Sequence, residues 1–143
     1  MRAALSAALT ELGSPPATGP DPGRRGLAEL QSACLDAVLA ALAAGLRPHP
    51  DAVRVAVRYL LDALAAAAPG RAVEVRVPPY GAVQCISGPA HTRGTPPNVV
   101  ETDPVTWLRL ATGGLSWQEG IERGAIRASG PRADLSAHLP VSR

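Results

Sequence analysis

Phenylalanine and lysine are both missing from this 143-residue chain, and aromatic residues of all kinds make up only 3% of it. All 14 basic residues are therefore arginines, and the net charge is only +2. The arginines are scattered along the chain, whereas a nucleic-acid-binding domain carries a basic patch or stripe. We therefore expect no nucleic-acid partner.

Cysteine and histidine are also scarce. Two cysteines, Cys34 and Cys85, are too few for a small disulfide scaffold, so we expect two reduced thiols and a cytoplasmic protein. The three histidines are far apart, and the spacings typical of zinc ligands are absent, so we expect no metal site and no cofactor. No apolar run approaches the roughly 20 residues of a membrane span, and residues 1–12 make a poor signal peptide. We expect no integral membrane contact.

The composition that remains is that of a globular chain with one flexible end. Hydrophobic residues make up 46% and charged residues 18%, and the length suits one domain. Residues 13–26 form a Pro/Gly-rich linker with nothing to bury. We therefore predict a flexible segment over residues 1–26 and a single domain over residues 27–143.

Two long Ala/Leu patterns predict helices over Leu27–Ala44 and Asp51–Ala68. Because the link between them is short, we expect the helices to pack as an antiparallel hairpin. The apolar stripe predicted for the first helix is Leu35, Val38, Leu39, Leu42 and Leu46.

Residues 72–102 read as β-structure. Strict alternation of valine with charged residues predicts a half-buried strand over 72–77. The Pro78–Gly81 turn then leads into a strand over 82–87, and a third strand is predicted over 97–102. The sequence does not determine the register of the first strand pair. A slip of one residue would exchange the faces of the sheet on which Gln84 and Cys85 lie.

The remaining chain predicts short elements separated by glycine. Asp103-Pro104 favours a helix start, and Gly113-Gly114 ends that helix. Ser116 and Glu119 have capping-box spacing, so a second short helix follows and ends at Gly124. A strand over 125–129 and a last short helix over 131–139 complete the prediction.

This order of elements resembles the sterol carrier protein 2 domain over roughly residues 52–139. The matching pieces are Trp107–Gly113, Gly124–Gly130 and Asp134-Leu135, which place a helix with a glycine stop, an edge strand and a final short helix in the family's order. The whole chain is most similar to small bacterial sterol carrier family proteins. It also resembles the C-terminal domain of mycothiol-dependent maleylpyruvate isomerases.

The resemblance implies an α+β fold, in which a helical hairpin precedes a mixed, twisted sheet of about four or five strands with short helices on one face. It also implies non-catalytic binding of a lipid, a sterol or another small apolar or amphipathic molecule in a cavity between sheet and helices. Because the chain has no Phe to build the walls of a large tunnel, a small or vestigial pocket is as compatible with the sequence as a large one. The residues expected to line it are Tyr80, Val99, Trp107, Leu108, Ala111, Leu115, Trp117 and Ile121.

A second hypothesis is an enzyme or enzyme accessory that acts on a small anionic metabolite through the polar loop His91–Asn98. Arg93 and the backbone of Gly94 have the chemistry to hold a carboxylate or phosphate of a small anionic metabolite. Cys85 and His91 would then form an activated thiol pair. The polar residues of this site are Gln84, His91, Arg93 and Asn98.

The same residues also have ordinary structural interpretations. Arg93 would pair with Glu101 or Glu74, and Asn98 would close a turn. Arg76 is either solvent-facing or paired with one of the same two glutamates. A third hypothesis is a ligand-free interaction module, because exposed sheet edges favour pairing with another chain. A homodimer is one such arrangement.

Overall fold

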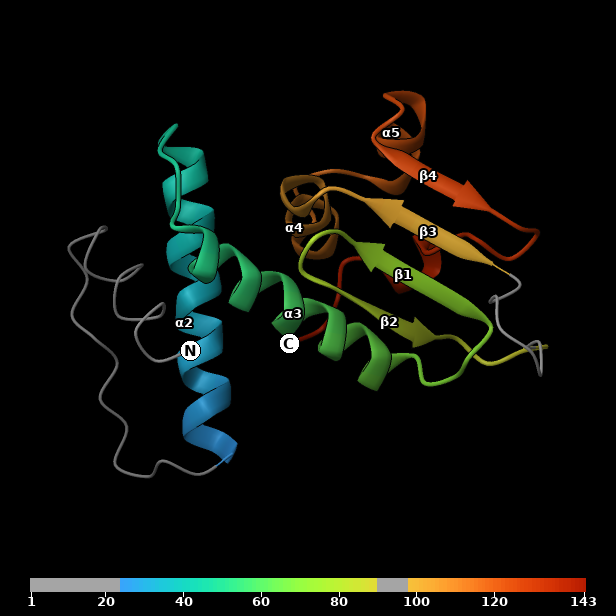
Figure 1. Ribbon diagram of the computed structural model, residues 1–143, viewed down its shortest axis with the longest axis horizontal. Coiled ribbons are helices and arrows are strands. Elements are labelled where there is room, and N and C mark those ends of the chain that lie inside the picture. The colour runs from blue at the N-terminus through green and yellow to red at the C-terminus, as the bar shows by residue number, and fades with distance from the viewer. Residues whose placement is uncertain (1–23, 90–97) are drawn as a thin grey trace. The chain divides into compact units, whose positions relative to one another are not determined.

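The computed structural model describes residues 24–89 and 98–143 (Figure 1). Predictions for residues 1–23 and for residues 90–97, which include His91 and Arg93, lie outside the described residues. The chain divides into two compact units, and the division falls inside a helix, between Tyr59 and Leu60.

The first unit contains helix α2, Arg24–Ala43, and the first part of helix α3, Pro50–Ala67. The Cys34 thiol donates to the carbonyl of Ala52 over 3.6 Å, so the first turn of α3 lies beside the middle of α2. Among the described residues of this unit, the buried side chains are Cys34, Leu35, Ala37, Val38, Ala41, Ala52, Val55, Ala56 and Val57.

Helix α2 differs from its prediction at both ends. It begins at Arg24, inside the predicted linker, and ends at Ala43. Leu46, assigned to its apolar stripe, is 53% exposed, which makes that assignment wrong. The reason is that the chain turns back after the helix, where the Leu46 N–H donates to the Ala41 carbonyl.

Helix α2 also bears on the expectation that no apolar run is long enough to span a membrane. Its stretch Gly26–Ala43 is long and apolar enough to span a bilayer by length and composition alone. A core helix and a signal sequence pass the same test, so this stretch carries no membrane assignment.

The second unit is built on a four-stranded sheet: β1 Val73–Val77, β2 Gly81–Cys85, β3 Val99–Thr102 and β4 Ile126–Ser129. The strand order is β2-β1-β3-β4 (Figure 1). Strand β1 runs antiparallel to β2 and parallel to β3, and β3 runs antiparallel to β4. The sheet is therefore mixed, and the predicted α+β class is confirmed.

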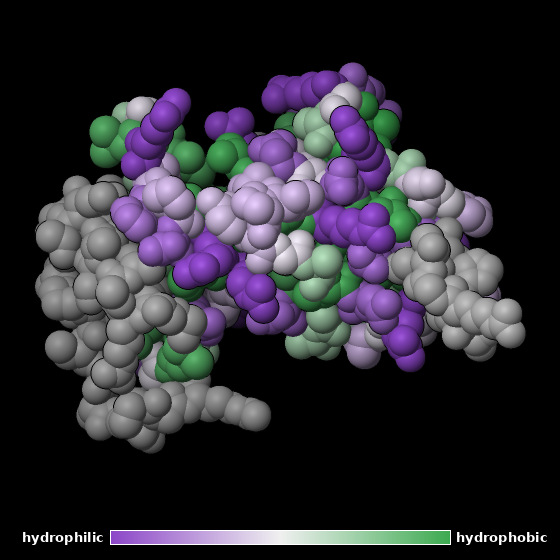
Figure 2. All heavy atoms as spheres, viewed as in Figure 1, coloured by the Kyte–Doolittle hydropathy of each residue, from purple (hydrophilic) through white to green (hydrophobic). Residues whose placement is uncertain are grey.

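The register gives the sheet one buried and one polar face. Val73 pairs with Cys85, which places Cys85 on the buried face and Gln84 on the other. The buried face carries Val73, Val75, Val77, Cys85, Val100 and Ile126. Glu74, Arg76, Glu101 and Arg127 lie on the polar face, and hydrophilic side chains cover much of the surface over β1 and β3 (Figure 2).

Strand β2 ends earlier than predicted, at Cys85, because Ile86 has left-handed backbone with φ 66°. Two backbone bonds hold it there: Ile86 N–H donates to Ala68 over 2.7 Å, and Ala72 N–H donates to Ile86 over 3.0 Å. A Cβ atom on Gly70 would lie 2.1 Å from the Ile86 carbonyl oxygen. Only glycine therefore lets the end of α3 approach the sheet so closely.

The short helices follow their predicted start signals. Helix α4, Pro104–Thr112, is capped by Asp103, and helix α5, Trp117–Glu122, has the complete capping box of Ser116 and Glu119. A Cβ on Gly120 would lie 2.4 Å from Ile126 Cδ1, so α5 packs directly on the buried face of β4.

The helix predicted over residues 131–139 is wrong. The structure has only a 3-10 turn at Ser136–His138. Asp134 Oδ1 accepts from the Ser136 N–H over 2.8 Å, so this side chain occupies a donor of the expected helix.

Candidate binding site

Helix α4 places three of the predicted ligand-binding residues in the core of the second unit, and a fourth, Leu115, follows just after it. Trp107 and Leu108 are fully buried, and Ala111 and Leu115 are nearly so. The helix holds this position because Asp103 caps its start and because the Val141 N–H donates to the Ala111 carbonyl at its end. These four residues form one apolar surface beneath the helices.

The other predicted apolar residues are more exposed than these four. Val99 lies on the polar face of the sheet, because its neighbour Val100 points into the core. Tyr80, in the β1–β2 turn, and Trp117, at the start of α5, are half-buried, whereas Ile121 is 41% exposed.

Asn98 is part of the scaffold. Its Nδ2 donates to the Ala72 carbonyl over 2.7 Å, and its Oδ1 accepts from the Arg132 N–H over 2.8 Å. The side chain is buried and ties the starts of β1 and β3 to the C-terminal segment. Both its donor and its acceptor functions are therefore used within the protein.

Cys85 lacks the properties of an activated nucleophile. Its side chain is fully buried, and burial raises the pKa of the thiol to about 11. A nucleophilic cysteine instead needs a lowered pKa and access to solvent. Gln84 is exposed on the opposite face, where its Oε1 accepts from Arg71 Nε over 3.1 Å.

The polar face carries charges of alternating sign on neighbouring strands. Arg76 Nε lies 2.5 Å from Glu74 Oε1, and this hydrogen bond, followed by the charges of Glu74 and Glu101, raises the pKa of Arg76. Glu101 also faces Arg127 across β3 and β4, with 3.9 Å between Oε2 and Nη1. Arg76 thus takes the paired alternative predicted for it, whereas the Arg93–Glu101 pair lies outside the described residues.

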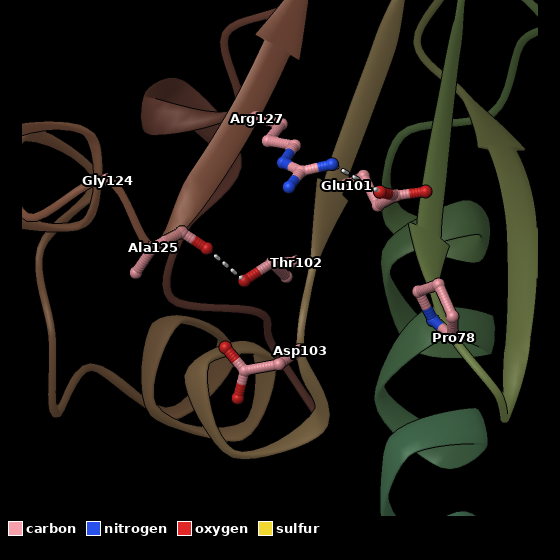
Figure 3. Close-up of a pocket in the computed structure, with 7 residues that line it drawn as sticks. All are labelled: Pro78, Glu101, Thr102, Asp103, Gly124, Ala125 and Arg127. Carbon is pink, nitrogen blue, oxygen red and sulfur yellow. Dashed lines mark hydrogen bonds and ion pairs between the residues drawn. The ribbon is translucent and has the colours of Figure 1, made fainter.

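A pocket opens at the end of β3, where β4 begins (Figure 3). Its volume is about 360 Å³. Within its lining, Thr102 Oγ1 donates to the Ala125 carbonyl over 2.8 Å. It is lined by Pro78, Glu101, Thr102, Asp103, Gly124, Ala125 and Arg127.

This pocket was not predicted from the sequence, although the alternation along residues 98–102 was a signal that could have placed Glu101 on the outward face. Its rim holds opposite charges at Glu101 and Arg127, and the Arg127 side chain is 86% exposed. Such a lining suits small polar groups better than an acyl chain. None of the pocket's lining residues belongs to the apolar surface formed by Trp107, Leu108, Ala111 and Leu115.

Comparison with protein families now places the chain. A family described as bacterial SCP ortholog matches residues 49–141, a span that includes the whole sheet together with α4 and α5. The chain belongs to this bacterial sterol carrier protein-like family. The predicted family is thus confirmed. No curated protein matches the sequence.

Proposed function

We propose that this member of the bacterial SCP ortholog family binds a small apolar or amphipathic molecule, such as a lipid or sterol, without changing it chemically. The observation that carries the proposal is the family match over residues 49–141. Its span includes the sheet, α4 and α5, between which the proposed ligand lies.

The physical basis of the proposal is the apolar surface of α4. Trp107, Leu108 and Ala111 present buried apolar area that would bind an acyl chain or ring system if α4 moved from the sheet. Because these side chains are packed in the described structure, binding must first open that layer. The apparent affinity is then lowered by the fraction of molecules in the closed state.

The proposal is tested by titration with a fluorescent fatty acyl probe and a fluorescent sterol. The Trp117→Phe variant leaves Trp107 as the only tryptophan, so quenching or energy transfer reports binding next to α4. Saturable binding with a change in Trp107 emission is expected.

A pair of variants locates the site. Ala111→Leu places a larger side chain in the space that the ligand would occupy once α4 moves, so probe binding should weaken about tenfold, equivalent to about 1.4 kcal/mol. Val99→Leu, on the polar face, is the matched control and should bind as the parent does. The absence of saturable binding by either probe, or equal weakening by both variants, contradicts the proposal.

A further inference from the structure

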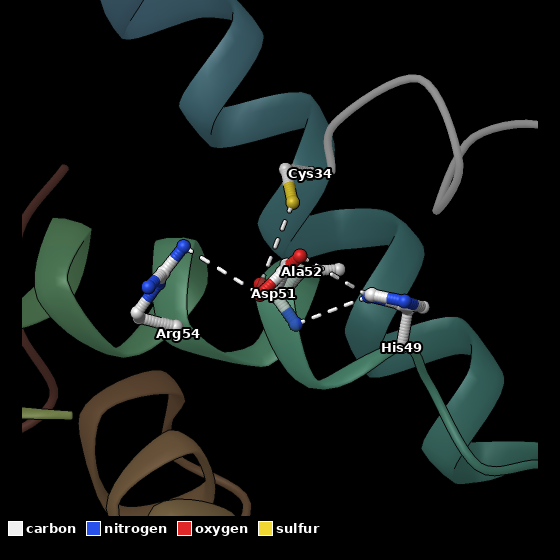
Figure 4. A network of polar contacts seen from close by, with 5 residues as sticks. All are labelled: Cys34, His49, Asp51, Ala52 and Arg54. Carbon is white, nitrogen blue, oxygen red and sulfur yellow. Dashed lines mark hydrogen bonds and ion pairs between the residues drawn. The ribbon is translucent and has the colours of Figure 1, made fainter. Parts of the chain in front are cut away.

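The start of helix α3 is capped by a histidine (Figure 4). His49 Nδ1 accepts from the Asp51 N–H over 3.2 Å. The His49 carbonyl accepts from the N–H groups of Ala52 and Val53 over 3.0 and 3.1 Å. The imidazole therefore stands where Ser, Thr, Asp or Asn usually satisfies the free N–H groups of a helix start.

This cap works only while Nδ1 carries a lone pair. A protonated imidazole has N–H groups on both nitrogens and accepts no hydrogen bond. Its positive charge also lies at the helix end where the macrodipole disfavours cations. Imidazole is the side chain that ordinarily changes charge between about pH 5 and 8.

The protonated ring has an alternative partner beside it. Asp51 Oδ2 lies 3.8 Å from His49 Nδ1, and the other carboxylate oxygen lies 3.5 Å from Arg54 Nη2. We infer that His49 is a pH-dependent cap: when neutral it holds the first turn of α3, and when protonated it turns to the Asp51 carboxylate and releases that turn.

The release reaches α2 through one contact. The Cys34 thiol donates to the carbonyl of Ala52, a residue of the same first turn. In the described part of the chain, the charged or titratable groups that make polar contacts at this corner are Asp51 and Arg54 from α3 and Cys34 from α2 (Figure 4). Asp51 and Arg54 are about half exposed, with side-chain exposures of 51% and 50%. Because water surrounds much of both side chains, the effect of their charges is confined to this corner.

Nuclear magnetic resonance of the full chain tests the first step. The Asp51 amide shift should follow the His49 ring through its titration, with the same midpoint. His49→Asn keeps a side-chain acceptor that does not titrate, so the Asp51 amide should then lose this pH dependence. His138→Asn is the matched control and should retain it. An Asp51 amide that does not titrate with His49, or that titrates equally in His49→Asn, overturns the inference.

Thiol labelling at one fixed pH tests the second step. His49→Lys places a permanent positive charge at the cap without an acceptor, whereas His49→Asn keeps the cap closed. We expect Cys34 to be alkylated several-fold faster in His49→Lys than in His49→Asn. Cys85, also fully buried, is the internal reference and should react at the same rate in both. Equal Cys34 rates in the two variants would show that the first turn stays in place, against the inference.

Discussion

Asn98 is a buried polar residue on which three segments of the second unit depend. Its side-chain amide joins the Ala72 carbonyl before β1 to the Arg132 N–H in the C-terminal segment. The backbone carbonyl of Asn98 accepts from the Glu74 N–H. Buried amides with both functions satisfied fix one arrangement, because any other leaves a polar group unpaired.

Replacing Asn98 should therefore destabilise the fold. For Asn98→Ala we expect a loss of about 2–4 kcal/mol in the free energy of unfolding, since the Ala72 carbonyl and the Arg132 N–H both lose their partner. Urea denaturation of the variant and parent measures the difference. The exposed residue Gln84 provides the control, because Gln84→Ala should change stability by no more than about 0.5 kcal/mol. Equal effects of the two substitutions would contradict the role given to Asn98.

The sequence alone could not predict that the Asn98 side chain joins these segments. The partners of the Asn98 side chain lie 26 and 34 residues away along the chain. Turn propensity describes only neighbouring residues, so it was compatible with a closed turn and with a polar site. The left-handed backbone of Ile86 has the same origin, since isoleucine rarely adopts it and only contacts with Ala68 and Ala72 hold it there.

At the scale of elements, local signals were sufficient wherever the stabilising contact is itself local. The alternating valines of β1 and the caps at Asp103 and Ser116 all act within a few residues, and their predictions are confirmed. The parallel pairing of β1 with β3 instead depends on contacts across the sheet. The sequence therefore predicted the strands but not the faces of Val99 and Gln84, which the register decides.

The cap of α4 should be needed to hold the proposed apolar surface. Asp103 accepts from the Thr106 N–H over 3.1 Å and from the Thr106 hydroxyl over 2.5 Å. Asp103→Ala should cost about 1–2 kcal/mol of stability, whereas Asp103→Asn keeps an acceptor and should lose less than about 1 kcal/mol. Urea unfolding of the two variants measures both. If the alanine variant were as stable as the asparagine variant, the cap would not support α4.

At the scale of the whole molecule, α3 links the two compact units because the division falls inside it. Its first part supplies Ala52, Val55 and Ala56 to one unit, and its second part supplies Leu60, Leu61 and Leu64 to the other. A helix is cooperative along its length, so unwinding one part removes support from the next. We therefore expect the two units to unfold in one transition.

The two cysteines test this expectation, because each unit contains one. Burial raises the pKa of both the Cys34 and the Cys85 thiols from 9.0 to about 11. The unfolded chain then loses these protons at lower pH than the folded chain. The stabilisation is complete below about pH 9 and is lost as the pH rises towards 11, by about 2–3 kcal/mol for each thiol.

Urea unfolding at several alkaline pH values in Cys34→Ala and Cys85→Ala should therefore show a shallower loss of stability than in the parent. Both variants retain Tyr59 and Tyr80, so the tyrosine contribution cancels in the comparison. With one cooperative transition, each substitution flattens the pH dependence of that transition by a similar amount. Two transitions, each responding to only one of the substitutions, would show instead that the units unfold separately and that α3 does not couple them.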